Sequence, residues 1–327
     1  MILRLAGLTM LTLLALFVSL LVGGASFPLS QTFDALLHPR AAGDLSTILW
    51  ALRFPRVCIA AVVGGSLGIA GAMLQGMLRN PLVDPYLTGV SAGAACAISI
   101  AIAVGIAAPI VPALGFVAGL LTAMVVAALA RRGAGIDSNR LILAGVSLSA
   151  LFSAVVALIL TRLQQGGYAQ AILAWLAGSL SGRGWHDLLF AAPYALAGLV
   201  IAVLSVPALN ALRLGDLRAK TIGVNVDRAQ WTILASASLL TASAVSLSGI
   251  IGFIGLIVPH IVRRIVGSDA RLLITGSAIA GAGFMALADA AARSLFAPVE
   301  IPIGVLLAFI GVPTFLYLYL RPTRAAA

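Results

Sequence analysis

Long apolar runs follow one another along the whole chain and are separated by short connections that carry most of its polar residues. A membrane-spanning helix needs about 20 apolar residues to cross roughly 30 Å of hydrocarbon. The pattern therefore predicts about ten transmembrane helices. Their expected ranges are 2–24, 57–78, 87–107, 111–130, 141–161, 188–204, 231–248, 250–266, 272–287 and 303–320.

The composition supports this interpretation. Hydrophobic residues make up 61% of the chain, charged residues 9%, and the mean hydropathy is +1.13, whereas soluble domains carry roughly a quarter charged residues. We therefore expect one all-α, polytopic domain over residues 1–327 in a lipid bilayer. The net charge of +10 does not indicate a nucleic-acid partner, because the basic residues lie at helix ends and form no continuous polar face.

The distribution of Lys and Arg predicts the orientation, because positively charged connections are retained in the cytoplasm. With the N-terminus inside, fourteen of the twenty basic residues are cytoplasmic. The first segment is too long and apolar for a typical signal peptide, so we expect an anchor helix. Both termini are expected in the cytoplasm. The six external basic residues are Arg40, Arg53, Arg56, Arg162, Arg183 and Arg293.

Small residues recur at helical spacing in the second segment, at Gly64, Gly68, Ala72 and Gly76. Such a stripe allows the backbone of another helix to approach closely. We interpret it as a packing surface.

The sequence offers no catalytic group and no metal site. Its three histidines are scattered, and Cys58 and Cys96 lie in apolar stretches. The only lysine, Lys220, follows Ala219, so the Gly-Lys-Ser/Thr of a phosphate-binding loop is missing. Any ATP and Mg²⁺ must be bound by separate ATPase subunits, and the chain itself is expected to hold no cofactor. Asp289 lies one helical turn from Arg293, which predicts an intrahelical ion pair.

Several motifs occur in order along almost the whole chain. They are 53–56 (RFPR), 71–76 (GAMLQG), 79–93 (RNPLVDPYLTGVSAG), 143–146 (LAGV), 252–260 (GFIGLIVPH), Ala288-Asp289 with Arg293, and 300–304 (EIPIG). In these motifs the chain resembles the FecCD-type permease subunits of type II ABC importers, which carry iron-siderophores, haem or vitamin B12 (cobalamin).

The resemblance implies a ten-helix subunit of the bacterial inner membrane. Two copies would form a homodimer, with two ABC ATPase subunits on the cytoplasmic side and a periplasmic or extracellular substrate-binding protein outside. A shift of five spans would relate the two halves as an inverted repeat.

Arg53, Arg56 and Arg293 are expected at the external ends of helices. In similar transporters, arginines at matching positions bind glutamates of the substrate-binding protein, and a guanidinium group suits such bidentate contacts. We therefore predict a docking site here. The alternative is that these arginines anchor helix ends at lipid headgroups.

The connection 207–228 is the longest polar cytoplasmic segment and is the predicted coupling element. Ala219 and Gly223 match the Ala-xxx-Gly core of the ABC coupling motif, while Leu214, Leu217 and Ile222 would form an apolar contact face for the ATPase. The alternative is a plain interfacial loop.

Ser138 and Asn139 precede the fifth span and match the gate positions of the cobalamin-type relatives, although either could equally cap the helix. Gly145, Ser147 and Ser149 are predicted to line the pathway further in. Pro81, Asp84 and Pro85 interrupt the helical pattern and predict a rigid turn.

The sequence thus predicts a non-enzymatic permease of an ATP-driven importer for haem or a ferric siderophore, with cobalamin as an alternative. A membrane transferase would need clustered carboxylates, which the ten acidic residues do not form. An ion-coupled secondary transporter would need charged or broken helices near the bilayer midplane.

Overall fold

The computed structural model describes residues 2–23, 35, 44–131, 133, 135–163 and 167–320, and this part of the chain is helical with one isolated β-bridge between Arg131 and Ile136. The elements are α1 (Ile2–Leu21), α3 (Asp44–Thr47), η1 (Ile48–Arg53), α4 (Phe54–Met77), η2 (Pro85–Thr88), α5 (Val90–Ala103), α6 (Val111–Ala130), α7 (Ser138–Arg162), α8 (Tyr168–Ala177), α9 (Trp185–Leu204), α10 (Val206–Arg213), α11 (Asp216–Thr221), α12 (Val226–Ser248), α13 (Ile254–Val266), α14 (Ala270–Ser294) and α15 (Ile303–Leu320).

Every predicted span contains a helix, and the all-α membrane fold is confirmed. Seven helical stretches in the described residues are long and apolar enough to cross a membrane. The other three predicted spans are shorter helices, namely α5, α13 and α15. The sequence missed α8, a ten-residue apolar helix that is too short to cross a bilayer and lies between Gly167 and Gly178, both at positive φ.

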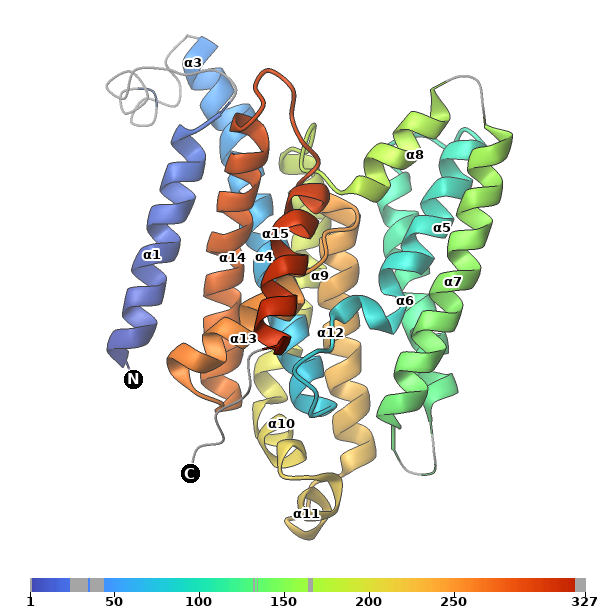
Figure 1. The fold of residues 1–327 in the computed structure, drawn as a ribbon, viewed down its shortest axis with the longest axis vertical. Helices are drawn as coiled ribbons and strands as arrows, with labels where there is room; N and C mark the ends of the chain where they lie inside the picture. Colours follow the sequence, from blue (N-terminus) through green and yellow to red (C-terminus); the bar gives the residue numbers. More distant parts are fainter. Residues whose placement is uncertain are drawn as a thin grey trace.

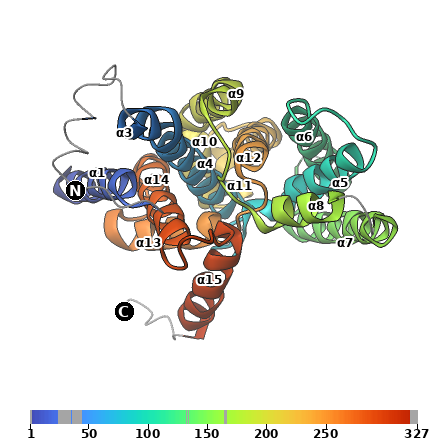
Figure 2. The same ribbon diagram turned by 90° about the horizontal axis from the view of Figure 1, so that it is seen from above.

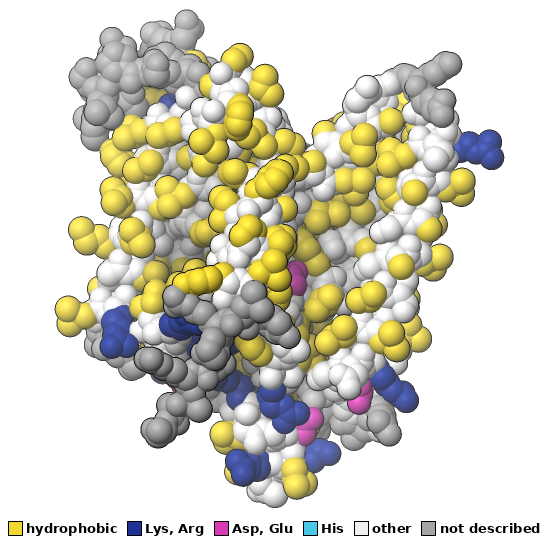
Figure 3. All heavy atoms as spheres, in the orientation of Figure 1, with side chains coloured by type: hydrophobic (Ala, Val, Ile, Leu, Met, Phe, Trp, Pro, Cys, Tyr) yellow, Lys and Arg dark blue, Asp and Glu magenta, His cyan; other side chains and the backbone are white. Residues whose placement is uncertain are grey.

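The helices form two groups. In Figures 1 and 2, α5, α6, α7 and α8 stand together on one side, and α4 and α12 lie inside the larger group with α9, α13 and α14. Hydrophobic side chains cover the flanks of the molecule, while Lys and Arg gather mainly at its lower end, around α10 and α11 (Figure 3). This distribution suits a protein whose sides face lipid.

The glycine stripe on α4 is confirmed as a packing surface. A β-carbon at Gly64 would overlap the carbonyl oxygen of Gly281, and one at Gly68 would overlap that of Ser277, both on α14. The two helices therefore touch through their backbones, which is possible only because these positions carry no side chain.

Two buried helices are each followed by a break and a short helix. After α4 the chain turns through 78–84 into η2 and then α5, and after α12 it passes through 249–253 into α13. The second break corrects the predicted span 250–266, because the helix begins only at Ile254. The breaks occur five predicted spans apart, as the inverted-repeat prediction requires.

Hydrogen bonds connect the segments at the two breaks. The Tyr86 hydroxyl donates to the carbonyl of Ile251 at 2.9 Å and accepts from its N–H at 2.8 Å. The side-chain Nε2 of Gln75 donates to the carbonyls of Val83 (3.3 Å) and Gly255 (3.1 Å). These bonds satisfy backbone groups that water cannot reach inside a membrane. At the predicted turn, the Asp84 side chain accepts from the Tyr86 N–H at 2.9 Å and fixes the start of η2.

We expect Gly64→Leu to destabilise the protein by about 1–3 kcal/mol or more, because the added side chain must separate α4 from α14. The measurement is the midpoint of thermal unfolding in detergent. Gly7→Leu on α1 is the matched control, because a β-carbon there meets no atom within 4 Å. Equal midpoints for the two variants would contradict the backbone contact.

Candidate functional site

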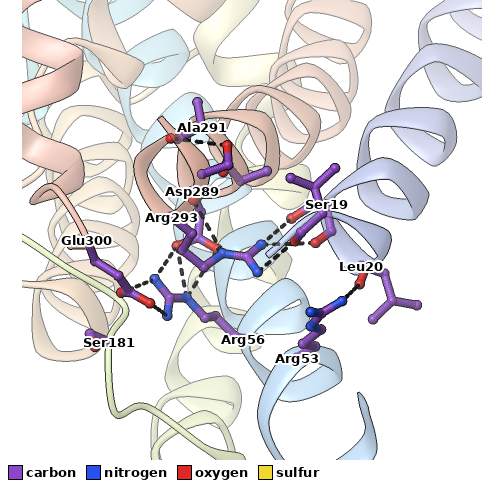
Figure 4. Close-up of polar contacts among 12 residues, drawn as sticks. Ser19, Leu20, Arg53, Arg56, Ser181, Asp289, Ala291, Arg293 and Glu300 are labelled. Atoms are coloured by element: carbon purple, nitrogen blue, oxygen red, sulfur yellow. Dashed lines mark hydrogen bonds and ion pairs between the residues drawn. The ribbon is translucent and has the colours of Figure 1, made fainter. Parts of the chain in front are cut away.

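Four arginines line a pocket of about 370 Å³ at the upper end of the molecule, together with Glu300. Arg53 ends η1, Arg56 lies in the first turn of α4, and Arg293 lies in the last turn of α14. Arg183 comes from the connection between α8 and α9. The structure therefore brings the three arginines of the predicted docking site into one pocket (Figure 4).

Asp289 is the buried centre of this cluster, with no exposed surface. Nε and Nη2 of Arg56 lie 3.0 Å and 2.9 Å from its carboxylate oxygen Oδ1. Nε of Arg293 lies 3.0 Å from the same carboxylate. The predicted intrahelical pair with Arg293 is confirmed, and Arg56 is a second partner from α4. Two guanidinium groups and their hydrogen bonds offset the cost of burying this carboxylate.

Arg53 and Arg293 also hold the end of α1. Arg53 donates to the carbonyls of Leu20 (3.3 Å) and Leu21 (2.9 Å), and Arg293 donates to those of Ser19 (2.9 Å) and Val22 (3.0 Å). The last carbonyls of a helix lack partners within the helix and carry partial negative charge, which cations stabilise. Both arginines are almost fully buried, so each has a structural task besides any docking contact.

Glu300 covers the outer edge of Arg56. Its carboxylate oxygens lie 3.2 Å from Nη1 and 3.0 Å from Nη2, and its side chain is 38% exposed. Burial opposes ionisation, but the hydrogen bond and charge of Arg56 outweigh it and hold the pKa of Glu300 below its ordinary value. The sequence placed Glu300 in a motif but gave no partner for it.

The predicted coupling element lies at the opposite end, where α10 and α11 project from the molecule (Figure 1). Leu214, Leu217 and Ile222 are 59%, 78% and 63% exposed. Ala219 is fully buried on the inner side of α11, and Gly223, at φ +88°, turns the chain toward α12. The exposed apolar surface therefore consists of the two leucines and the isoleucine.

Polar contacts connect α11 to two other segments. Asp216 lies 3.4 Å from Arg79, which follows α4, and accepts a hydrogen bond from the Gln230 side chain at 3.3 Å. The same Gln230 side chain accepts from the backbone N–H of Ile136 at 2.6 Å. Gln230 thus joins α11 to the turn before α7. The sequence gave no sign of this role, because the three segments are far apart along the chain.

The predicted gate residues begin α7, at the same end of the molecule as α11 (Figure 1). Ser138 is half-buried and Asn139 is exposed. The interpretation that either residue caps the helix is wrong, because the cap is Asp137, whose side chain accepts from the N–H of Arg140 at 2.9 Å.

Two of the three predicted pathway residues line a second pocket, of about 530 Å³. Gly145 and Ser149 on α7 face it together with Tyr86, Ser91 and Ile250. A β-carbon at Gly145 would overlap the carbonyl oxygen of Leu87, so glycine permits η2 to approach α7. Ser147 is exposed and does not line this pocket, because it lies on another face of α7.

Within the described residues, no three His, Cys, Asp or Glu side chains approach closely enough to hold a metal ion.

Seven apolar helices of membrane-spanning length in the described part of the chain, with charged residues at the two ends of the molecule, define the class of multi-pass membrane proteins. More particularly, the chain belongs to the FecCD transport family, whose model matches residues 11–321.

Known relatives are similar in sequence over nearly the whole chain. It is 38% identical to the hemin transport system permease protein HmuU of Yersinia pestis, over 94% of each protein. It is 39% identical to the cobalamin import system permease protein BtuC of Halobacterium salinarum, over 92% of this chain and 81% of that protein. A solved inward-facing ABC transporter, provisionally of the metal-chelate type, matches with a TM-score of 0.87 and 33% identity over 96% of this chain and 98% of that one. The chain is therefore an ABC-type permease of the metal-chelate and cobalamin family.

We expect Asp289→Ala to cost about 3–5 kcal/mol of stability, because it leaves two largely buried guanidinium groups without their carboxylate. Denaturant unfolding in detergent measures the loss. The control is Asp187→Ala, which removes a partly exposed carboxylate that lies 3.0 Å from Arg183 and also accepts from the Gly184 N–H at 3.0 Å. It should cost only about 1–2 kcal/mol. Similar small losses in both variants would contradict the central role of Asp289.

Proposed function

We propose that this chain is the membrane-spanning subunit of an ATP-driven importer that moves a bulky metal chelate, haem or a ferric siderophore, into the cytoplasm. Cobalamin is the alternative substrate. The observation that carries the proposal is the exposed apolar tip of α10–α11 at one end of a family permease whose other end holds an arginine pocket. The chain performs no covalent chemistry, and ATP and Mg²⁺ bind to partner ATPases.

The apolar tip is the proposed contact with the ATPase. Leu214, Leu217 and Ile222 expose their side chains on a projecting segment, and such a surface is typical of a protein interface when no lipid covers it. This assignment puts α11 in the cytoplasm. The N-terminus, at the start of α1, and the end of α15 then face the cytoplasm of a bacterial inner membrane as well.

The arginine pocket is the proposed contact with an external substrate-binding protein. Its wall contains Arg53, Arg56, Arg183 and Arg293 against one exposed acid, Glu300. A cationic pocket of this kind attracts carboxylates, and guanidinium groups bind them in a fixed geometry. Among the three docking residues, Arg56 has the most exposed side chain, at 12%, and its outer contact is the partly exposed Glu300.

The exposed side of α7 is the proposed contact with a second copy of the chain. Only 11% of the residues in the most apolar 18-residue stretch of α7 are buried within the subunit. Its exposed side chains include Leu143, Val146, Leu151 and Leu158. Pairing of α7 with its equivalent would build the pathway between two subunits, with Ser138 and Asn139 as the cytoplasmic gate. Ser147, exposed on α7, would then face that shared pathway.

Gln230 supports a route from ATP hydrolysis to the gate. It contacts Asp216 on α11 and the backbone of Ile136, directly before α7. Movement of α11 on the ATPase would therefore pull on the cytoplasmic end of α7 and switch the paired helices between outward-open and inward-open states.

The test of the function is ATP hydrolysis and uptake by the chain assembled in lipid vesicles with its partner ATPase. The binding protein is added empty or loaded with haem, ferric siderophore or cobalamin. Stimulation by one loaded protein supports the importer and identifies the substrate. Uptake that persists without ATP and stops when the proton gradient collapses would contradict it and favour a secondary transporter.

We expect Leu217→Ser to weaken ATPase binding by roughly 10- to 100-fold, because burial of one leucine contributes about 1.5–3 kcal/mol. Co-purification and titration with the ATPase measure the change. Val299→Ser is the matched control, since Val299 is 67% exposed in the connection between α14 and α15, at the opposite end. Normal ATPase binding by the Leu217 variant would exclude the tip as the contact.

Gln230→Leu keeps the side-chain size but removes both hydrogen bonds between α11 and the turn before α7. We expect the assembled complex to hydrolyse ATP while uptake per ATP falls by roughly 5- to 150-fold, the usual range of coupling between sites. Gln170→Leu, an exposed position on α8, is the control. An unchanged ratio of uptake to hydrolysis in the Gln230 variant would remove this residue from the coupling route.

A further inference from the structure

All three nitrogen atoms of Arg56 already face carboxylates within the subunit. Nε and Nη2 contact Asp289, and Nη1 and Nη2 contact Glu300. The guanidinium group has five N–H donors in one plane. An incoming carboxylate can therefore form a two-bond contact with Arg56 only if one internal carboxylate leaves.

The two internal carboxylates differ in their freedom to leave. Asp289 has no exposed surface and is also held by Arg293 at 3.0 Å, so its departure would strand two arginines. Glu300 lies in the connection between α14 and α15, its side chain is 38% exposed, and its ion pair with Arg56 is at the outer edge of the pocket (Figure 4). Water can solvate Glu300 once it rotates away, whereas Asp289 has no access to water.

We infer that Glu300 is an internal competitor that occupies the outer edge of Arg56 until a carboxylate of a docking protein replaces it. This inference rests on the proposed docking function and adds a residue that lowers the affinity of the docking protein for Arg56. The partner it selects must present a carboxylate that can form two bonds to Arg56 at once. Glu300 also lowers the positive charge of the pocket by one while no partner is bound.

The chain offers a control for simple charge effects. Arg183 and Asp187 form a separate ion pair at 3.0 Å, and Arg183 lines the same pocket. Glu300→Gln and Asp187→Asn each raise the local charge by one, but only Glu300→Gln frees the fork of Arg56. A general electrostatic effect would appear in both variants, whereas competition would appear in one.

The first experiment measures binding of the cognate substrate-binding protein to the full chain in lipid nanodiscs at pH 7, where Glu300 is ionised. We expect Glu300→Gln to lower the Kd by about twofold or more, because the competing carboxylate is partly exposed and its loss frees Arg56, and Asp187→Asn to change it less. In an Arg56→Lys background, the gain from Glu300→Gln should disappear, because lysine offers no planar fork. An equal gain in both acidic variants, or weaker binding by Glu300→Gln, would overturn the inference.

The second experiment needs no binding protein. Phenylglyoxal modifies accessible arginines, and mass spectrometry reports the extent at each position. We expect phenylglyoxal to modify Arg56 several times faster in Glu300→Gln than in the chain without substitutions or in Asp187→Asn. Equal rates in all three would overturn the competitor role even if docking is real. Absence of any binding by the unmodified chain, with faster labelling of Arg56, would instead reject the docking function and leave the internal contact intact.

Discussion

Satisfaction of backbone hydrogen bonds inside the membrane is the constraint on which this fold depends. Helices meet it within themselves, but the breaks after α4 and α12 do not. The Tyr86 hydroxyl and the Gln75 amide supply the missing partners by joining one break to the other. Irregular backbone is tolerated in a membrane only where protein surrounds it or where it lines a cavity. Here Tyr86 and Ile250 also line the 530 Å³ pocket, so the stabilised breaks form part of the proposed pathway.

The same requirement applies to charge at the ends of the molecule. Asp289 is buried because Arg56 and Arg293 compensate it, and the remaining donors of Arg293 hold the final carbonyls of α1. One cluster therefore connects α1, α4 and α14. Since Glu300 completes the cluster from the next connection, the contact proposed for docking shares residues with the contact that stabilises the fold. Substitutions at Arg293 or Asp289 will therefore affect both docking and the stability of the fold, whereas a substitution at Glu300 mainly affects docking.

The sequence predicted the helices better than the contacts between them. Apolar length located a helix in each of the ten expected ranges, and within the described residues seven of these helices are long enough to cross a membrane. The glycine spacing on α4 predicted close packing, because this too depends on local pattern. The short helix α8 was missed, since ten residues cannot cross a bilayer. The helical cap was assigned one or two residues away from Asp137. The pairing of Arg56 with Asp289 joins residues 233 positions apart, and no local pattern reports such a contact.

The most direct test of the account is an electron cryo-microscopy structure of the chain in a lipid nanodisc with its ATPase and its substrate-binding protein. We expect two copies of the chain to contact each other through α7. The leucines of α10–α11 should be buried in the ATPase, and a carboxylate of the binding protein should lie on Arg56 at the opposite end. A complex in which α11 is free, or in which both proteins bind the same end, would contradict it.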